Sequence, residues 1–368
     1  MQNAVDTTRK SPLKATAPVG LRDIAKDLNI SVSLVSKVLS GRMGNSGAAA
    51  GMVRAIQEKA QELQYQKNRQ AEALSTGRQN AIAVCIHRHG EAGSAIVEEM
   101  VEGIAQEAAV HQQRLVIQYY TTLPQFRAFA PELHRNLVDG VIMGGIGHPE
   151  LIEDLNAMDQ RGLPAVTILD KKLGAGFANV GMDQVEVSRR ATAQLIAQGC
   201  RRIAHFGELV KAPVGTNGFT PAASWNLGQS RREGYALALQ EAGLEYHPEL
   251  VVAVSDFSYA AGLEGTTVLL DKDLPFDGIV GQSDHHVAAA LNLLVTRGWK
   301  VPQQVKLIGI DNAPFCLYAI VPLSSVSQEF ESRGRHAVRL LMDKLNGGII
   351  SSIQVEPTVH VRLSSMRV

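Results

Sequence analysis

The feature that most constrains the fold is a repeated alternation of short apolar segments with amphipathic segments, which begins at Ala81. Apolar stretches such as AIAVCI and KLIGID are typical of strands buried on both faces of a sheet. The stretches between them, such as IVEEMVEGIAQEAAVHQ, have apolar residues at helical intervals. The pattern occurs in two sets, the first ending near Asp183. We therefore expect a core of two similar α/β lobes, each a parallel sheet covered by helices.

Polar residues follow several of the predicted strands, at the ends where open parallel sheets bind their ligands. They are His87 and Arg88, Asp170, Ser283 and Asp284, and Asp311. A two-lobed core would bring these strand ends together across a cleft, so we treat them as one candidate constellation. No glycine fingerprint or Walker loop accompanies the strands, and the usual signature of nucleotide phosphate binding is therefore missing.

A different pattern, from Leu21 to about Leu63, predicts three short helices. In the stretch LRDIAKDLNISVSLVSKVLSG, Asn29 and Ile30 make a turn and Ser31 is a candidate N-cap for a second helix. The small side chain of Ala25 allows the two helices to approach closely. This arrangement predicts a helix-turn-helix. The alternative is an ordinary helical hairpin packed in a core.

In helix-turn-helix geometry, the outward residues at the start of the second helix face base edges in the major groove of DNA. These residues are Val32 and Ser33, with Lys37 one turn later on the same side. The hydroxyl groups of Ser31 and Ser36 suit phosphate contacts, which set the register without selecting sequence.

The distribution of charge agrees with a DNA-binding N-terminal part and a separate core. The formal net charge of the whole chain is zero, but residues 1–80 hold 12 Lys and Arg against 6 Asp and Glu, and the remainder holds 24 against 30. The positive excess therefore lies where phosphate neutralisation would be needed.

The sequence lacks the signatures of several other classes of protein. No apolar stretch approaches the roughly 20 residues of a membrane span, and residues 1–18 have no apolar core of a signal peptide, so we expect a cytoplasmic protein without membrane contact. Cys85, Cys200 and Cys316 are widely spaced in apolar surroundings, which indicates reduced thiols. We expect no metal and no cofactor.

Short patterns distributed along the chain carry a family resemblance. They are Asp23-Ile24-Ala25, Ile30-Ser31, Val35-Ser36-Lys37, the series Leu63, Tyr65, Asn68, Ala71, Leu74 and Gly77, Arg231 with Gly234, Gly309 with Asp311, and the run Pro322 to Val326. Through them the chain, from Val19 to about Ser364, resembles the LacI/GalR family of bacterial transcriptional regulators. It departs from the family at Leu34, at Lys67, and in residues 42–51 and 207–230.

The resemblance implies an N-terminal all-α helix-turn-helix headpiece and an α/β core of two parallel-sheet lobes, like a type I periplasmic binding protein. The expected boundaries are a tail (1–18), a headpiece (19–66), a hinge (67–79) and a core (80–368). Within the core, the expected N-lobe is 80–182 with 330–347, and the expected C-lobe is 183–328 with 350–368.

For DNA, the resemblance implies that the hinge orders when two copies meet on a pseudopalindromic operator, which makes the protein a homodimer. Asn68 and Ala71 would belong to the DNA-binding hinge, and Leu74 would be an apolar wedge in the minor groove. The alternative is that Leu74 packs against its own headpiece. Because no leucine heptad segment follows the core in this sequence, we do not expect the tetramers that such a segment forms in some members of the family.

For the core, the resemblance implies an effector, most simply a sugar, bound by carboxylates, a guanidinium and an aromatic ring. The implied residues are Asp170, Arg231, Phe257, Ser283, Asp284 and Asp311, with His87 as a further candidate. Each also has a structural alternative, such as turn capping, a surface ion pair or core packing. His87 and Arg88 would favour a sugar acid or a phosphorylated sugar. Whether the effector weakens or strengthens DNA binding stays open.

Two rival functions share the predicted core. A solute-binding protein of the periplasmic type would need an export signal, where this chain has a predicted headpiece. An enzyme acting on sugars could use Asp170, Asp284 and Asp311 as acid and base, but no nucleophile motif, metal spacing or phosphate loop accompanies them. We therefore expect a regulator and no enzymatic activity.

Overall fold

The chain divides into two compact units, Met1–Arg78 and Gln79–Val368. In the computed structural model, the described residues are 19–41, 49–66, 73, 77–87, 94–133, 137–145, 148–170, 176–209 and 222–367. Each unit is considered separately below.

Within residues 19–41 and 49–66 of the first unit, three helices surround a small apolar core. They are α1 (Leu21–Asp27), α2 (Val32–Leu39) and α3 (Ala50–Glu62). Asn29 adopts a positive φ of 51° in the turn after α1. The Ser31 hydroxyl then accepts a hydrogen bond from the backbone N–H of Leu34 at 3.2 Å, which confirms it as the N-cap of α2. Ile24, Val35 and Ile56 are fully buried between the helices, and Ala25 packs in the same cluster.

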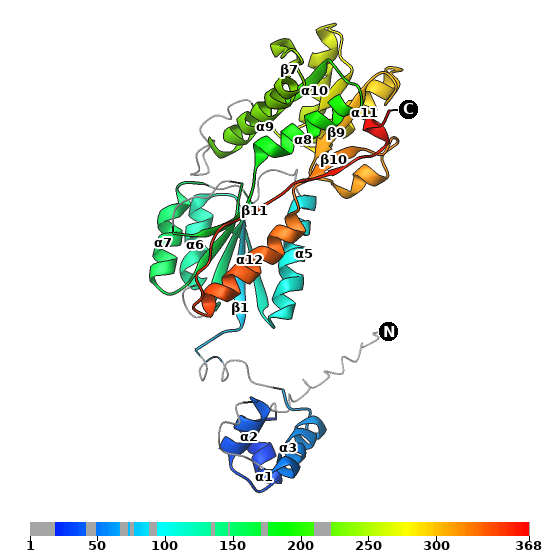
Figure 1. Cartoon of the computed structure of the whole chain (residues 1–368). Coiled ribbons are helices and arrows are strands. Elements are labelled where there is room, and N and C mark those ends of the chain that lie inside the picture. The colour runs from blue at the N-terminus through cyan, green and yellow to red at the C-terminus, as the bar shows by residue number, and fades with distance from the viewer. Residues whose placement is uncertain are drawn as a thin grey trace, which may run out of the picture. The chain divides into compact units, whose positions relative to one another are not determined.

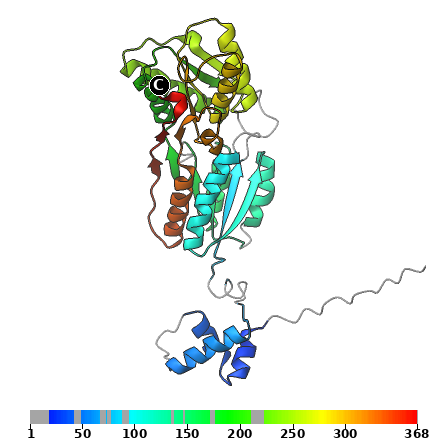
Figure 2. The ribbon, with the colours of Figure 1, turned by 90° about the vertical axis from the view of Figure 1, so that its right-hand side faces the viewer.

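The first lobe of the core is a six-stranded sheet in the order β11-β5-β4-β3-β1-β2, with every neighbouring pair parallel. Its strands are β1 (Ala81–His87), β2 (Arg114–Tyr120), β3 (Gly140–Gly144), β4 (Ala165–Ile168), β5 (Ala178–Met182) and β11 (Ile353–Val355). Its helices are α5 (Ser94–Val110), α6 (Leu123–Leu133), α7 (Leu151–Gln160) and α12 (Phe330–Leu345). Figure 2 shows these helices on both faces of the sheet.

The central strand β1 shows why this sheet needs cover on both sides. All seven of its residues are buried. Ala81, Ala83 and Cys85 pack in the cluster that α6 and α7 complete, whereas Ile82, Val84 and Ile86 pack in the cluster that α5 and α12 complete. Successive side chains of a strand point to opposite faces, so an unbroken apolar run is the sequence of a doubly covered strand.

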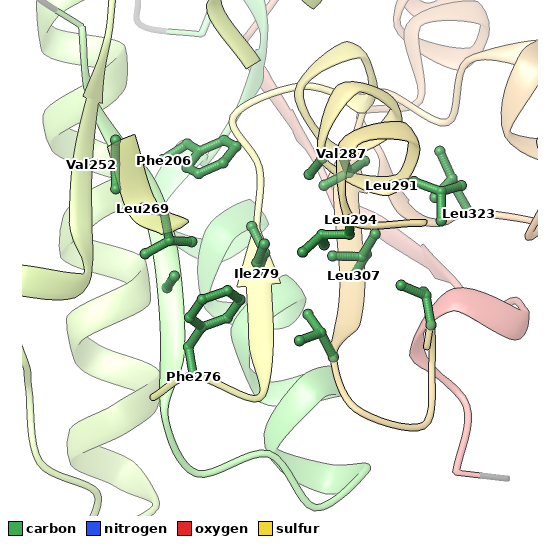
Figure 3. Close-up of a cluster of buried hydrophobic side chains, with 14 of the residues drawn as sticks. Phe206, Val252, Leu269, Phe276, Ile279, Val287, Leu291, Leu294, Leu307 and Leu323 are labelled. Atoms are coloured by element: carbon green, nitrogen blue, oxygen red, sulfur yellow. The ribbon is translucent and has the colours of Figure 1, made fainter. Parts of the chain in front are cut away.

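The second lobe is a six-stranded sheet in the order β12-β10-β9-β8-β6-β7, in which only the β10–β12 pair is antiparallel. Its strands are β6 (Ile203–Leu209), β7 (Val251–Val254), β8 (Gly278–Val280), β9 (Lys306–Ile310), β10 (Ser324–Ser327) and β12 (Thr358–His360). Its helices are α8 (Gln184–Ala197), α9 (Ala222–Glu241), α10 (Tyr259–Asp271) and α11 (Asp284–Thr296), with short 3-10 turns at Pro248–Leu250, Pro314–Leu317 and Leu363–Ser365. Figure 3 shows Phe206, Leu269 and Ile279 packed in the core of this lobe.

The chain passes between the lobes after β5, after β10 and after β11, because β5 and β11 belong to the first sheet while β10 and β12 belong to the second. The middle passage leads into α12, which lies against α5 of the first lobe (Figure 1). The sequence assigned residues 350–368 to the second lobe, and here the structure differs, since Ile353–Val355 pair with β5 of the first sheet. A three-residue strand carries too little pattern to reveal its partner.

The cysteines are as the sequence led us to expect. Cys85, Cys200 and Cys316 are free, buried thiols, as predicted. Among the described helices, none is long and apolar enough to cross a membrane.

Candidate DNA-binding and effector sites

The start of α2 presents the surface that the sequence predicted to contact DNA. Ser31, Val32, Ser33, Ser36 and Lys37 are all exposed, and Val32 retains 40% exposure although it is apolar. The opposite side of the same helix is buried at Val35 and Val38. The predicted hinge residues Asn68, Ala71 and Leu74 lie outside the described residues.

In the core, Arg231 on α9 is held in a fixed position by several acceptors. Only 2% of the residue is exposed. Its Nε donates to Oε1 of Gln184 at 2.9 Å, and its Nη1 donates to the backbone carbonyl of Gln282. The guanidinium carbon lies 5.8 Å from the centre of the Phe257 ring. The structure therefore brings together two of the predicted effector residues, Arg231 and Phe257.

A chain of hydrogen bonds continues from Arg231 to Asp311 through two glutamines. The amide of Gln184 donates to Oε1 of Gln328 at 2.7 Å, and the amide of Gln328 donates to Oδ1 of Asp311 at 2.6 Å. Gln184 begins α8 directly after the first passage between the lobes, and Gln328 lies on the second passage. The sequence analysis missed both glutamines because they flank the lobe connections rather than the strand ends.

The backbone at Asp311 is strained. Its φ is 109°, a conformation that is sparsely populated by residues other than glycine. The next residue, Asn312, also has a positive φ, of 57°. Strain of this kind persists only where the surroundings enforce it, and it concentrates at functional sites. The strained segment directs the Asp311 carboxylate toward Gln328 at the end of β9.

Ser283 and Asp284 instead make their bonds within the second lobe. Asp284 is fully buried at the start of α11, where it accepts a hydrogen bond from the Ser325 hydroxyl at 2.6 Å and one from the Ala313 N–H at 2.7 Å. A Cβ atom on Gly309 would overlap the Asp284 carboxylate, which explains the glycine before Asp311. Ser283 caps α11 and donates to the Phe257 carbonyl at 2.9 Å. The second contact fixes the segment that carries the Phe257 ring.

Asp170 and His87 lie on the first lobe and have different neighbours. The Asp170 side chain is 36% exposed and its Oδ1 lies 3.5 Å from Nη2 of Arg333 on α12. His87 is buried, with its Nδ1 3.4 Å from Nε2 of His148 and its ring 5.3 Å from that of Tyr120. Tyr120 belongs to the α6 and α7 side of the sheet. Arg88, which the sequence analysis named together with His87, lies outside the described residues.

Burial changes the protonation of the carboxyl groups in this region. It raises the pKa of Asp284 and that of Asp311 to about 7. At Asp311 the charge of Arg231 and the Gln328 hydrogen bond oppose this rise in pKa, while the neighbouring Asp284 adds to it. Burial also raises the pKa of Glu99 on α5 to about 7, aided by the charges of Glu329 and Asp311.

Replacing Asp311 by asparagine should stabilise the core more at pH 8 than at pH 5. The folded protein holds the Asp311 proton up to about pH 7, whereas an unfolded aspartate loses it near pH 4, so its ionisation progressively destabilises the fold across that window. Asparagine keeps an acceptor for Gln328 and tolerates a positive φ. We expect the difference in unfolding free energy between D311N and the natural chain to grow by about 1–3 kcal/mol from pH 5 to pH 8.

Calorimetric unfolding of both proteins across that range measures this difference. The comparison with the natural chain is needed because the buried His205 and His286, whose pKa values burial lowers to about 3 and about 4, give the opposite pH dependence in both proteins. A pH-independent difference would show that Asp311 is already ionised at pH 5.

Comparison with known proteins gives the same architecture. Residues 192–365 match the family model of the periplasmic binding protein-like domain. The transcriptional regulator CelR of Thermobifida fusca is 27% identical over 93% of this chain and 96% of its own length. The repressor CytR of Escherichia coli K12 is 24% identical over 90% of this chain and 91% of its own length.

Solved structures agree in fold over nearly the whole chain. The CelR–cellobiose complex matches with a TM-score of 0.66 and 25% identity, covering 94% of this chain and 99% of that one. The lac repressor dimer bound to operator and the anti-inducer ONPF matches with a TM-score of 0.75 and 18% identity, covering 95% of this chain and 99% of that one.

The chain combines a helix-turn-helix unit with a two-lobed, periplasmic-binding-protein-like core. This combination is that of a DNA-binding transcriptional regulator, as in the relatives above, rather than that of an enzyme or a solute-binding protein. Over nearly its whole length the chain is similar to the regulators CelR and CytR, which supports the LacI/GalR resemblance found in the sequence.

Proposed function

We propose that this regulator is a homodimeric repressor whose affinity for a pseudopalindromic operator is controlled by a sugar-like effector bound in its core. The observation that carries the proposal is the hydrogen-bonded chain from Arg231 to Asp311, because it passes through residues at two of the connections between the lobes. A ligand that bonds to Arg231 or Asp311, at either end of this series of hydrogen bonds, would act directly on the segments that connect the lobes.

On the DNA side, Val32 and Ser33 contact base edges in this proposal, with Lys37 contacting the operator one turn later. Ser31 and Ser36 bind phosphates. Their exposure at the start of α2 supports these roles, since that end of a recognition helix enters the major groove. Asn68, Ala71 and Leu74 would add hinge contacts in the minor groove when two copies meet on DNA.

On the effector side, Asp170, Arg231 and Asp311 bond the ligand hydroxyl groups and the Phe257 ring packs against an apolar face of the ligand. Carboxylates accept and a guanidinium donates, which suits vicinal hydroxyls. Ser283 and Asp284 act by positioning Phe257 and the end of β9, as their internal bonds indicate. The cellobiose complex of CelR supports a sugar as the ligand class. His87 would contribute from the first lobe.

Switching follows from differential affinity. An effector that prefers one arrangement of the lobes shifts the protein toward that arrangement and changes operator affinity by the same coupling free energy. The amides of Gln184 and Gln328 join the two connections, so they are the residues through which the ligand would select an arrangement.

A dimer would also cover apolar surface that a single chain leaves exposed. Leu317, Tyr318 and Ile320 in the second lobe are 64%, 75% and 74% exposed. Val116 and Tyr119 on the edge strand β2 of the first lobe are 38% and 46% exposed. Contiguous exposed apolar residues of this size commonly mark interaction surfaces, and a second copy would bring the two headpieces needed for a two-fold operator.

Selection from randomised DNA duplexes with the full chain tests the proposal. We expect a two-fold symmetric consensus, a dimer by analytical ultracentrifugation, and a change in operator affinity when a stabilising sugar is added. An asymmetric consensus bound by a monomer, or an operator affinity unchanged by every ligand that the core binds, would refute it.

Substitutions at the start of α2 should change which bases are selected. Val32→Ala or Ser33→Ala should alter preference at one or two base pairs per half-site, with a loss of about 1–3 kcal/mol for the original operator. Lys37→Ala should weaken all duplexes more evenly. None of the three side chains is buried in the headpiece, so far-ultraviolet circular dichroism should be unchanged. The same consensus from all three variants would show that α2 is not the recognition helix.

A further inference from the structure

Arg333 is a buried cation that the sequence analysis did not identify. It lies near the start of α12, and only 1% of the residue is exposed. The next residue, Gly334, packs so closely on α5 that a Cβ atom there would overlap the Met100 carbonyl oxygen. The helix is therefore fixed against its neighbour, and the Arg333 side chain is held toward the interior of the first lobe.

The N–H groups of this guanidinium make few and long hydrogen bonds. Its Nη2 lies 3.4 Å from the Val180 carbonyl oxygen and 3.5 Å from Oδ1 of Asp170, both long distances for a hydrogen bond. Among the described residues, no acceptor lies within reach of Nε or Nη1, although both atoms are buried. By contrast, Nε of Arg231 makes a bond of 2.9 Å to Gln184. Buried charges are normally paired and fully hydrogen-bonded.

The surroundings fix the orientation of the group without neutralising it. The guanidinium carbon lies 4.7 Å from the centre of the Phe330 ring, and a ring face can hold a guanidinium plane. Asp170 is the nearest counter-charge, but its carboxylate is partly exposed and lies 3.5 Å from a single nitrogen, Nη2. Burial raises the pKa of Asp311 to about 7, so at neutral pH this second carboxyl is only partly ionised. The counter-charge that acts on Arg333 is that of Asp170, which also acts on Arg231.

Arg333 also adjoins the proposed effector site. Its neighbour Asp170 is partly exposed to solvent, and the Asp170 charge acts on both Arg231 and Asp311. A ligand bonded to Asp170 would thus lie beside the Arg333 guanidinium. Each of its two planar forks, Nε with Nη2 and Nη1 with Nη2, has one donor without a partner among the described residues and can match the two oxygens of a carboxylate or phosphate.

We propose that Arg333 binds an anionic group, a carboxylate or a phosphate, of a polyhydroxylated effector, and so makes the regulator selective for acidic sugars over neutral ones. The inference rests on the proposed function, because it assumes that the effector occupies this core. A neutral hydroxyl could accept a hydrogen bond from the guanidinium, but only an anion would also compensate its charge.

The first experiment compares ligands of matched size on the full chain. D-gluconate and D-galacturonate carry a carboxylate, D-glucose 6-phosphate carries a phosphate, and D-sorbitol, D-galactose and D-glucose are their respective neutral counterparts. Thermal shift and calorimetric titration should show binding by at least one anion, with neutral compounds at least ten-fold weaker, because charge-assisted bonds are the stronger ones. The carboxylate and phosphate arms identify which anion is preferred.

The second experiment uses variants of the cation. Arg333→Leu should weaken the bound acid by about ten- to hundred-fold while leaving the melting temperature of the free protein unchanged or higher, since an uncompensated charge is removed. Arg333→Lys should retain part of the affinity. Arg335→Gln, on the same helix but partly exposed and paired with Glu331, removes the same charge and should leave acid binding intact.

The outcomes separate the two proposals. If neutral sugars bind and acids do not, or if Arg333→Leu lowers the melting temperature without changing ligand preference, Arg333 is a structural cation and this inference is wrong while the proposed function stands. If neither acidic nor neutral polyols bind the natural chain, both proposals fail. Loss of acid binding in Arg333→Leu but not in Arg335→Gln supports the inference.

Discussion

A chain that begins at Gln79 should lose operator binding entirely and keep its affinity for the effector. The proposed base and phosphate contacts lie in Met1–Arg78, which has its own apolar core. Gln79 belongs to the other unit, because its N–H donates to Asp139 at 2.7 Å. Specific binding typically exceeds non-specific binding by at least about 1,000-fold, and the remaining chain also loses the excess of positive charge held in residues 1–80.

Fluorescence anisotropy with the selected operator and calorimetric titration with the effector measure the two affinities. We expect the first to fall below detection and the second to change by less than about two-fold, because the proposed effector residues all belong to the other unit. Val35→Ala in the full chain is a useful control, since it removes apolar packing from the headpiece core alone and should leave effector affinity unchanged. Retained operator binding would place recognition in the core, and lost effector binding would mean that the effector site needs the first unit.

Local signals in the sequence were sufficient to predict several elements. The turn at Asn29 and the cap at Ser31 each depend on neighbouring backbone groups, so short-range chemistry determines them. The buried strand β1 follows from an unbroken apolar run, and the strand-end positions of Asp170 and Asp311 follow from the sheet topology.

The remaining features of the core depend on contacts distant in sequence. Ile353–Val355 pair with β5 across more than 170 residues of chain, which three residues cannot specify. The Asp284 carboxylate is buried because it bonds to Ser325 and packs on Gly309. Both residues are distant from Asp284 in the sequence. Arg333 was detectable, because it lies on the same helical face as Phe330, Gly334 and Ala337, and a charged residue within an apolar stripe is a signal for a buried functional group.

Gly234→Ala should destabilise the core by about 3 kcal/mol or more, at the upper end of overpacking effects. Gly234 lies one turn after Arg231 on α9, and a Cβ atom there would overlap the Val185 carbonyl oxygen and crowd the Arg189 N–H on α8. Both obstacles are backbone atoms, so no side chain can rotate away and the two helices must separate. This close approach explains why arginine and glycine occur together in the pattern Arg231-x-x-Gly234.

The same displacement should also disturb ligand binding, because α9 carries Arg231 and α8 begins at its partner Gln184. Denaturant unfolding and calorimetric titration should therefore both respond, with effector affinity falling about ten-fold or more, equivalent to about 1.4 kcal/mol. Glu233→Ala changes the adjacent, exposed residue of α9 and should alter stability by no more than about 0.5 kcal/mol. If Gly234→Ala instead stabilised the protein by the 0.5–1 kcal/mol or so typical of an open helix position, such as Gly51, α8 and α9 would have to lie farther apart than the structure shows.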